Sequence, residues 1–341
     1  MKYITFVVPS YNSEAYLDRC IRSLLPGGDD VEIIIVNDGS TDNTGNIADS
    51  YANLYPNTVK VVHKKNGGHG SGVNAGIERA SGIYFKVVDS DDWVDSDSYI
   101  ILLNKIRESV EQGGESIDLF VTNYVYNRLA EKTSHRIHYK NVFDSNRITT
   151  WDDARRFTVS QYLMMHSLTF KTDVIRKAGV KLPEHTFYVD SIFAYQPLPY
   201  VGTLMYLDID FYQYYIGRED QSVNEKNMIR RIDQQFAVTR IVMNSYNIKD
   251  IRKKSPKLAN YMVRQISILL SITSVLCSLA DTYEYTLKMK ELWLELEMMD
   301  RSLYKQVRYF SFNVISTLPR PVCKKVSVFC YRFAKRTYMF A

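Results

Sequence analysis

The sequence predicts an α/β protein, in which a mostly parallel central sheet with flanking helices is followed by a helical C-terminal region. Two observations carry this prediction. Short apolar runs rich in β-branched residues alternate with segments of helical spacing early in the chain, and beyond residue 225 only helical spacing continues. We therefore expect two domains, at residues 1–225 and 226–341. The length of 341 residues and the hydrophobic content of 45% can support both.

The first domain is expected to begin with alternating strands and helices. Apolar runs predict strands at 4–9, 31–36, 58–62, 83–88 and 117–122, and helical spacing predicts helices near 14–25, 41–55 and 98–110. A short helix is also expected after the glycine-rich segment that separates the third and fourth strands. Strands that alternate with helices form βαβ units with parallel strands. Ligands of such sheets bind beyond the carboxyl ends of the strands.

Composition and charge exclude several classes of protein. A net charge of +5 without a recognisable binding motif makes nucleic acid a poor partner. The four cysteines are scattered without the spacing of metal ligands, as expected in a reducing compartment. The N-terminus enters a strand pattern at once, so no signal peptide is expected. The most apolar stretch, 266–280, is interpreted as a buried helix because it is too short to span a bilayer.

The segment 83–93 gives the strongest indication of chemistry. An apolar strand ends abruptly in Asp89, Asp91 and Asp92. Like charges this close repel one another unless a cation shares the site. Carboxylate oxygens suit Mg²⁺ or Mn²⁺, which commonly accompany phosphate groups. The sequence therefore predicts a metal–diphosphate site at the sheet edge. The alternative is an acidic turn that caps the next helix, since residues 95–97 also look like cap residues.

Two further polar clusters are expected at the same edge. Asp38 follows the second strand, where its carboxylate can accept the imide N–H of a uracil ring or cap the next helix. Residues 64–76 contain five glycines, which let backbone N–H groups approach an anion at the positive end of a helix. Because this segment lies between the other two clusters in the sequence, a role in nucleotide binding is favoured over a flexible surface loop. His69 in this segment is a candidate ligand, a phosphate contact or a bystander.

Two more clusters follow later in the first domain. Asp190 precedes a predicted helix, where it is either an N-cap or a general base whose proton affinity is raised by neighbouring aromatic side chains. An aromatic strand near residue 212 breaks into a polar loop. In this loop Arg218, Gln221 and Ser222 are candidate donors to a diphosphate, and a solvated surface loop is the alternative.

Four ordered motifs resemble those of family 2 glycosyltransferases, which are inverting enzymes of the GT-A fold. They read Val-Val-Pro-Ser-Tyr-Asn-Ser-Glu at 7–14, Ile-Ile-Val-Asn-Asp-Gly-Ser-Thr-Asp at 34–42, Asn-Gly-Gly-His-Gly-Ser-Gly-Val-Asn-Ala-Gly at 66–76 and Val-Val-Asp-Ser-Asp-Asp-Trp at 87–93. The third motif is similar to that of a branch common among bacterial surface-polysaccharide transferases. Val73 stands where the family commonly carries an Arg, so either a nucleotide or phosphate contact is lost, or Lys65, His69 or Arg218 replaces it.

The resemblance implies roles for individual residues. Asp89 and Asp91 form the DxD motif, with Asp91 closest to the metal, and Asp190 matches the catalytic base. Arg218, Gln221 and Ser222 lie in the segment that is expected to close over the diphosphate. The residues implied to contact the nucleotide are Pro9, Tyr11, Glu14, Asp38, Asn66, Gly68, Asp89 and Ser90. Further candidates without a fixed role are Asp92, His69 and His185.

These roles describe one reaction. A metal-dependent hexosyl- or N-acetylhexosaminyl-transferase would take its sugar from a UDP-sugar, with Mn²⁺ or Mg²⁺ neutralising the charge on the leaving UDP. Asp190 would remove the proton of an acceptor hydroxyl, which attacks the anomeric carbon in one inverting displacement. The expected acceptor is a glycan or lipid-linked sugar in capsule, exopolysaccharide or teichoic-acid synthesis. The alternative is a non-catalytic nucleotide- or sugar-binding subunit of a polysaccharide assembly complex.

The C-terminal tail is basic and aromatic. After Asp300 the chain contains no acidic residue, while Lys and Arg recur among Phe, Tyr and Val. This pattern suits the surface of an anionic membrane, and it predicts a cytoplasmic protein held peripherally at the inner face of the cell membrane. The alternative is a basic helix packed on its own core or on a partner subunit, which would make an oligomer.

Overall fold

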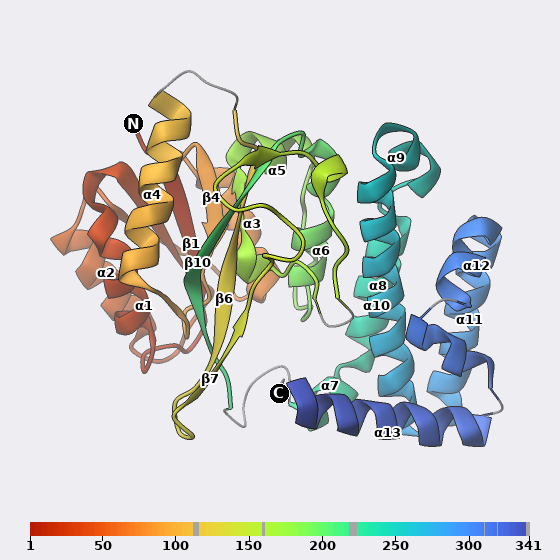
Figure 1. Cartoon of the computed structure of the whole chain (residues 1–341). Helices are drawn as coiled ribbons and strands as arrows, with labels where there is room; N and C mark the ends of the chain where they lie inside the picture. Colours follow the sequence, from red (N-terminus) through yellow and green to blue (C-terminus); the bar gives the residue numbers. More distant parts are fainter. Residues whose placement is uncertain (112–115, 159–160, 218–223, 310, 319, 339–341) are drawn as a thin grey trace. The chain divides into compact units, whose positions relative to one another are not determined.

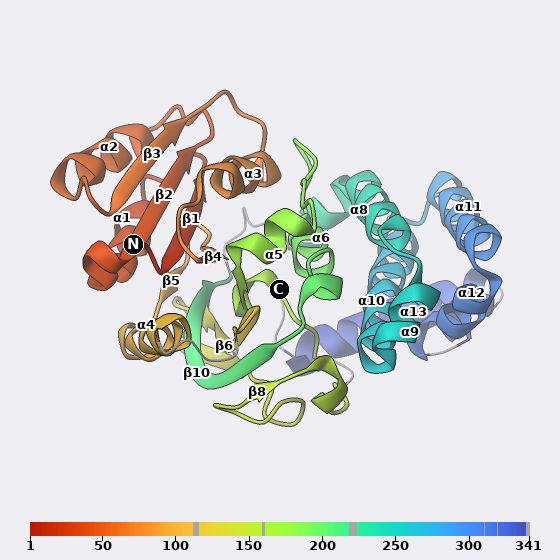
Figure 2. The same ribbon diagram turned by 90° about the horizontal axis from the view of Figure 1, so that it is seen from above.

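The computed structural model describes residues 1–111, 116–158, 161–217, 224–309, 311–318 and 320–338 (Figures 1 and 2). The lid candidates Arg218, Gln221 and Ser222 lie outside these ranges. The chain divides into two compact units, Met1–Ile216 and Gly217–Ala341. The domain boundary that was expected after residue 225 lies slightly later in the chain than this division, inside the second unit.

The first unit is built on one sheet, in which β3, β2, β1, β4, β9, β6, β10 and β5 lie in this order. Neighbours from β3 to β4 are parallel, β9 is antiparallel to β4 and β6, and β10 is parallel to β6. Only β9 and β5 therefore run against the rest of this path, as the predicted mostly parallel sheet requires. The strands are β1 (Ile4–Ser10), β2 (Val31–Asn37), β3 (Val59–His63), β4 (Tyr84–Val87), β5 (Trp93–Val94), β6 (Leu119–Arg128), β7 (Thr133–Ile137), β8 (Ile148–Thr149), β9 (Leu168–Lys171) and β10 (Leu204–Tyr215).

Helices cover both faces of this sheet. Phe6 of β1 packs edge-on against Tyr99 of α4, with ring centroids 5.4 Å apart, whereas Val7 faces Gly76 of α3. Because neighbouring residues of a strand point to opposite faces, α3 and α4 lie on opposite sides of the sheet (Figure 2). The α-helices are α1 (Leu17–Leu24), α2 (Thr44–Leu54), α3 (His69–Arg79), α4 (Ser96–Glu111), α5 (Thr172–Lys177) and α6 (Asp190–Tyr195), and short 3₁₀ helices lie at Leu25–Asp30, Trp151–Asp153, Met165–Ser167 and Leu198–Tyr200.

A bulge in β10 sets the register of the strand that reaches the candidate site. Thr122 of β6 pairs with Leu207, yet Tyr124 pairs with Tyr212, so Asn123 alone faces residues 208–211. Asn123 is fully buried. Its Nδ2 donates to Oδ1 of Asp208 at 3.1 Å and to Oδ1 of Asp210 at 3.0 Å. The side chain of Asn123 therefore spans the bulge.

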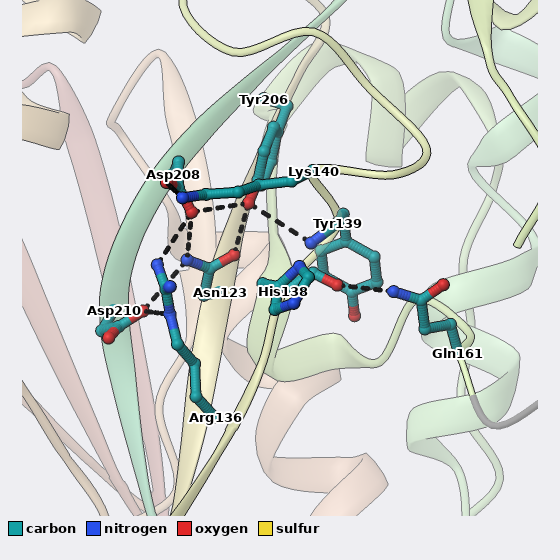
Figure 3. Close-up of polar contacts among 9 residues, drawn as sticks. All are labelled: Asn123, Arg136, His138, Tyr139, Lys140, Gln161, Tyr206, Asp208 and Asp210. Atoms are coloured by element: carbon teal, nitrogen blue, oxygen red, sulfur yellow. Dashed lines mark hydrogen bonds and ion pairs between the residues drawn. The ribbon is translucent and has the colours of Figure 1, made fainter. Parts of the chain in front are cut away.

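Basic side chains complete this bulge network, which consists of Asn123, Arg136, Lys140, Tyr206, Asp208 and Asp210 (Figure 3). Arg136 of β7 donates from Nη2 to Asp208 at 2.8 Å and from Nε to Asp210. Nζ of Lys140 lies 2.6 Å from Oδ2 of Asp208. Burial alone would raise the pKa of Asp208, but the hydrogen bonds and nearby positive charges lower it to about 2. The network thus keeps a charged carboxylate at the bulge and ties β10 to β6 and β7.

The second unit is entirely helical over its described residues, and α10 is its central helix. Helix α10 packs against α8, α9, α11, α12 and α13. A buried hydrogen bond of 3.1 Å joins Thr273 of α10 to Thr239 of α8. The elements are α7 (Glu225–Arg230), α8 (Ile232–Asn244), α9 (Ile248–Lys254), α10 (Pro256–Ala280), α11 (Tyr283–Met299), α12 (Arg301–Arg308), a 3₁₀ helix (Ser311–Thr317) and α13 (Arg320–Tyr338).

Helix α10 is longer than the apolar stretch that predicted it. Ser255 caps the helix and Pro256 begins it, so the helix has 25 residues and is long and apolar enough to cross a membrane. The expectation that this segment is too short for a span is therefore wrong. The expected burial is observed, since half of its most apolar window is buried inside the unit. A central helix of a packed bundle has the same composition, which makes this length weak evidence for a membrane span.

Candidate functional site

The carboxyl ends of β1, β2 and β4 carry the clusters that were predicted from the sequence. Strand β1 ends at Ser10, β2 ends one residue before Asp38, and β4 ends two residues before Asp89. Since these strands are parallel neighbours, their ends meet at one edge of the sheet. The three polar segments therefore lie together at one edge of the sheet, as the sequence predicted.

The acidic turn after β4 does more than cap the next helix. Asp95 is the residue that caps α4, because the N–H of Ser98 donates to its Oδ1 at 2.9 Å. Asp89 and Asp92 have other partners. The N–H of Asp89 donates to the hydroxyl of Tyr212 at 3.1 Å, and this hydroxyl donates to Oδ2 of Asp92 at 2.6 Å. Capping therefore accounts for Asp95 but not for Asp89 or Asp92.

The pKa values of Asp89 and Asp92 shift in opposite directions. Burial, together with repulsion from Asp91 and Asp89, raises the pKa of Asp92 well above its usual range, even though the N–H of Tyr215 donates to Asp92 at 2.7 Å. Burial would also raise the pKa of Asp89, but the neighbouring His69 lowers it below its usual value. The turn consequently places a carboxyl group that binds its proton less strongly than usual beside one that binds it more strongly.

His69 joins the third motif to the fourth. It is the first residue of α3, and its Nε2 lies 2.8 Å from Oδ1 of Asp89. Burial would lower the pKa of His69, but the charge and hydrogen bond of Asp89 raise it above its usual value, with smaller contributions from Asp190 and Asp91. The imidazole of His69 thus contacts the acidic turn directly, and its role as a ligand, a phosphate contact or a bystander stays a prediction.

Asp190 faces the same group of charges. It is the first residue of α6, and Val189 rather than Asp190 occupies the N-cap position. Burial raises the pKa of Asp190, the positive charge of His69 opposes this rise, and the charge of Asp89 adds to it. A carboxylate with a raised pKa that remains near a charged partner has the properties of a general base.

His166 completes a group of three side chains that could hold a divalent cation. One ligand atom from each of Asp89, Asp92 and His166 lies within 4.8 Å of the others, a grouping found within the part of the chain that the structure describes. His166 is 3% exposed, and its buried Nδ1 lacks a hydrogen-bond partner. An unpaired buried nitrogen is costly unless another group satisfies it. Two carboxylates and an imidazole therefore fit Mn²⁺.

Asp91 is not a member of that group. Its backbone carbonyl accepts a hydrogen bond of 2.7 Å from Nη2 of Arg19, and its charge contributes to the raised pKa of Asp92. The assignment of Asp91 as the residue closest to the metal stays a prediction. The structure instead adds His166 as a candidate ligand.

The carboxylate of Asp38 is already surrounded by donors. Lys64 donates from Nζ at 2.7 Å, and the backbone N–H groups of Gly67 and Gly68 donate at 2.7–3.1 Å. Asn66 donates from Nδ2 to the backbone carbonyl of Asp38 at 2.9 Å. These contacts fix the turn before α3 against the end of β2. Asp38 thus organises the second and third motifs rather than capping α2, and its contact with a uracil ring stays a prediction.

Side-chain hydrogen bonds fasten the first motif to Asn43, directly after the second motif, and to Ser90 of the fourth motif. Glu14 accepts from the N–H of Asn43 at 2.8 Å, and the hydroxyl of Ser90 lies 2.7 Å from that of Ser13. Pro9 lies near the end of β1, whereas Tyr11 is 53% exposed. Tyr11 is therefore open to a ligand, while Glu14 already has a structural partner.

The glycine-rich segment is mostly helix rather than loop. Helix α3 begins at His69, and a Cβ at Gly72 or Gly76 would lie 3.0 Å from Pro9 or 2.4 Å from Val7. These glycines allow α3 to approach β1 closely. The amides of Gly67 and Gly68 bind Asp38, so they are not free for an anion in this structure. Val73 is fully buried, which places its side chain in the core.

The loop before α6 closes against the start of α3. His185 donates its backbone N–H to the carbonyl of Gly67 at 2.6 Å, and its side chain is exposed. Ser71 donates to Oε1 of Glu184 at 3.0 Å. His185 adopts a positive φ of 48°. The backbone of His185 therefore has a structural role, and a contact of its side chain with a substrate stays a prediction.

Several residues of the site were not expected from the sequence. Lys86 is fully buried, and its Nζ donates to the carbonyls of His166 and Leu168 at 2.8 and 3.1 Å. Burial lowers the pKa of Lys86 to about 7. Tyr212 and Tyr214 place their rings 4.6 Å from that of His166. A lysine inside an apolar strand was the one signal that could have indicated Lys86, whereas nothing local marks the two tyrosines.

Comparison with known sequences finds similar proteins for the first half of the chain. The family model for glycosyl transferase family 2 matches residues 5–165. The uncharacterized glycosyltransferase EpsJ of Bacillus subtilis is 41% identical over 110 residues, or 32% of this chain and 30% of EpsJ. The glycosyltransferase GlyG of Streptococcus pneumoniae is 39% identical over 123 residues, or 36% of this chain and 38% of GlyG. The matches thus span about a third of the length of these relatives.

Comparison with solved structures extends over nearly the whole chain. The crystal structure of Staphylococcus aureus TarS 1–349 in complex with UDP-GlcNAc is similar, with a TM-score of 0.66 and 17% identity over 98% of this chain and 92% of TarS 1–349. The mannosyltransferase PcManGT of Pyrobaculum calidifontis, in complex with GDP-Man and Mn²⁺, gives a TM-score of 0.52 and 15% identity over 95% and 86%. At such low identity the likeness concerns the fold.

Proposed function

We propose that this chain is an inverting, metal-dependent glycosyltransferase, because residues 5–165 match the model of glycosyl transferase family 2 and the fold is the predicted GT-A fold. The proposed donor is a UDP-sugar, and the proposed acceptor is a hydroxyl of a glycan or a lipid-linked sugar in bacterial cell-surface polysaccharide synthesis. The product would carry the transferred sugar with an inverted anomeric configuration.

The observation that carries this proposal is the meeting of Asp190, His69 and Asp89 at the carboxyl edge of the sheet. Asp190 and Asp89 both act on the pKa of His69, and His69 contacts Asp89 at 2.8 Å. The proposed base and the proposed cation site therefore share one electrostatic environment. Transfer from a sugar nucleotide needs both, one for the attacking hydroxyl and one for the leaving diphosphate.

Asp190 is the proposed base. Its raised pKa favours removal of a proton from an acceptor hydroxyl as the oxygen attacks the anomeric carbon. The bond from that carbon to the diphosphate breaks in the same displacement, so no covalent intermediate with the protein is required. The positive charge of His69 keeps the pKa of Asp190 from rising further, which leaves more of the carboxylate ionised near neutral pH.

Asp89, Asp92 and His166 are proposed to hold the metal ion, together with or in place of the expected Asp91. When bound, Mn²⁺ or Mg²⁺ would neutralise charge on the leaving nucleoside diphosphate. The chain prepares this site in two ways. His69 keeps Asp89 charged, and Lys86 holds the turn that carries His166.

The choice of UDP rests on the first and second motifs and on the fold relative. Tyr11 is exposed beside the end of β1, near the turn that Asp38 and Asn66 organise. TarS, which shares the fold, was solved with UDP-GlcNAc. We therefore propose a hexosyl- or N-acetylhexosaminyl-transferase.

The proposed pathway is capsule, exopolysaccharide or teichoic-acid synthesis. Among the relatives, the minor teichoic acid biosynthesis protein GgaB of Bacillus subtilis is 32% identical over 145 residues. The proposed location is the cytoplasmic side of the cell membrane, where a peripheral enzyme can meet lipid-linked acceptors.

The test is UDP release from a panel of UDP-sugars with Mn²⁺, in the presence and absence of EDTA, for wild type and Asp190→Asn. Metal-dependent release from one donor that is lost in Asp190→Asn would support the proposal and identify the sugar. UDP-sugar binding without release, in the presence of a panel of glycan and lipid-linked acceptors, would favour a non-catalytic binding subunit instead.

A further inference from the structure

Helix α13 of the second unit has two different faces. One face packs inside the unit, where Ser327 is buried and Nζ of Lys324 forms an ion pair with Asp281. Burial raises the pKa of Tyr331 on this face to about 12, and Glu225 adds to the rise. The packing of one face fixes which residues of α13 point to solvent.

The opposite face combines exposed apolar and basic side chains. Val322 is 46% exposed, Phe329 is 70% exposed and Phe333 is 61% exposed. Lys325 and Arg332 are exposed as well. At about 100° per residue, these five positions fall within an arc of roughly 100° on the helix. We call this set the α13 face.

Burial in the chain's own core does not account for the α13 face. A phenylalanine that is 70% exposed forgoes most of the benefit of burying its ring. The two basic residues on the same arc sit in a segment without acidic residues, since none follows Asp300. An apolar stripe bordered by positive charge matches a surface that offers both negative charge and an apolar interior.

Helix α11 also has a row of exposed apolar side chains, and its charges differ from those of the α13 face. On α11, Tyr283, Leu287, Leu294 and Met298 are also exposed and lie on one side of the helix. Exposed acidic residues such as Glu291 belong to the same helix. Negative charge opposes approach to an anionic bilayer. The α11 stripe is thus a comparison that has apolar exposure beside charges of both signs, since Lys290 is exposed next to Glu291.

We propose that the α13 face docks on the surface of an anionic lipid bilayer, with Phe329, Phe333 and Val322 at the boundary of the acyl chains and Lys325 and Arg332 at the lipid headgroups. The inference deepens the proposed location and rests on it, but it does not depend on the proposed chemistry. Liposome binding without a sugar nucleotide tests it separately, and failure of either test leaves the other intact.

The experiment is co-sedimentation of the full chain with vesicles of phosphatidylcholine alone or of phosphatidylcholine with 30% phosphatidylglycerol. Wild type is expected to bind the anionic vesicles more tightly and to lose this preference as salt rises. The double variant Lys325→Gln, Arg332→Gln should weaken binding by about 30-fold, at about fivefold for each charge. Phe329→Ser should weaken binding at every salt concentration, because its contribution is apolar.

Matched controls test whether binding depends on the α13 face itself or on total charge and exposed apolar surface anywhere on the protein. Lys254→Gln with Lys290→Gln removes the same charge from α9 and α11, and Met298→Ser removes an exposed apolar side chain from the α11 stripe; both should bind as wild type. Equal binding to neutral and anionic vesicles, or equal loss in the controls, would overturn the proposal. A change in oligomeric state with Phe329→Ser and no vesicle binding would also overturn it, and would assign the face to a second copy of the chain.

Discussion

Nε2 of His69 lies 2.8 Å from Oδ1 of Asp89, and this contact connects the start of α3 to the acidic turn after β4. The two residues are 20 positions apart in the sequence and come from different motifs. Each shifts the pKa of the other, because a positive and a negative charge at this distance stabilise one another. The pair also sets the electrostatic environment of Asp190.

Replacing His69 with Gln should shift the pH dependence of turnover. The positive charge of His69 lowers the pKa of Asp190, so its removal raises that pKa. Asp190 acts as a base only when ionised, hence activity is present above its pKa and is lost as pH falls through it. The acid limb of kcat/KM should therefore move to higher pH in His69→Gln. An unchanged acid limb with the same maximal rate would show that His69 does not tune Asp190.

Replacing His166 with Ala should weaken metal binding. Loss of one of three candidate ligands is expected to reduce Mn²⁺ affinity by about 10- to 100-fold. Direct titration of Mn²⁺ in the absence of sugar nucleotide measures this without relying on turnover. His185→Ala serves as the control, since its side chain is exposed and is not part of the Asp89, Asp92 and His166 group. Equal affinity in both variants would remove His166 from the metal site.

Replacing Asp91 with Asn tests the prediction made from the DxD motif. If Asp91 contacts the metal, metal-dependent turnover should be abolished while the fold remains intact by circular dichroism. Full activity in Asp91→Asn, combined with weak Mn²⁺ binding in His166→Ala, would assign the metal to the three-residue group alone.

Replacing Asp208 with Asn should change how stability depends on pH. Asp208 contacts Asn123, Arg136, Lys140 and Tyr206 (Figure 3), and its pKa is lowered from 3.8 to about 2 in the folded chain. A carboxyl with a depressed folded pKa stabilises the protein above its unfolded pKa, and this contribution is lost as pH falls from about 4 to about 2. Asp208→Asn should therefore cost about 2 kcal/mol at pH 7 and progressively less in acid.

Urea unfolding at several pH values measures this difference. Asp144→Asn is the matched control, because Asp144 also pairs with an arginine, Arg155, but both side chains are about half exposed. Its pH profile should follow that of wild type. An Asp208→Asn variant with a constant deficit at every pH would show that packing, rather than charge, explains its role.

Replacing Gly76 with Ala should destabilise the first unit. A Cβ at Gly76 would lie 2.4 Å from both methyl carbons of Val7, so α3 would have to move away from β1. Overpacking of this kind costs about 1–3 kcal/mol. Gly72→Ala in the same helix is the comparison, since its Cβ would approach Pro9 only to 3.0 Å and gains about 1 kcal/mol of helix propensity. Equal stability of both variants in urea would show that the helix adjusts freely.

The sequence indicated the order of strands and helices in the first unit because local patterns suffice for it. The run 83–88 has the composition of a buried strand and became β4 (Tyr84–Val87). The glycines of the third motif were interpreted as a loop, yet most of them lie in α3. That error has a physical cause. Glycine is needed here because α3 packs closely against β1, and this tertiary contact cannot be predicted from the local sequence.

The sequence by itself determined the α/β class and the presence of acidic residues at strand ends, because hydrophobic periodicity and motif order are local properties. Only the tertiary structure decided which of these residues act together. His69 meets Asp89 because α3 packs on β1, and Tyr212 reaches Asp92 because β10 contains a bulge. His166 joins the acidic turn because Lys86 holds its backbone from a neighbouring strand. Burial then shifts the pKa values of Asp92 and Asp190, a property of the folded environment that no local pattern encodes.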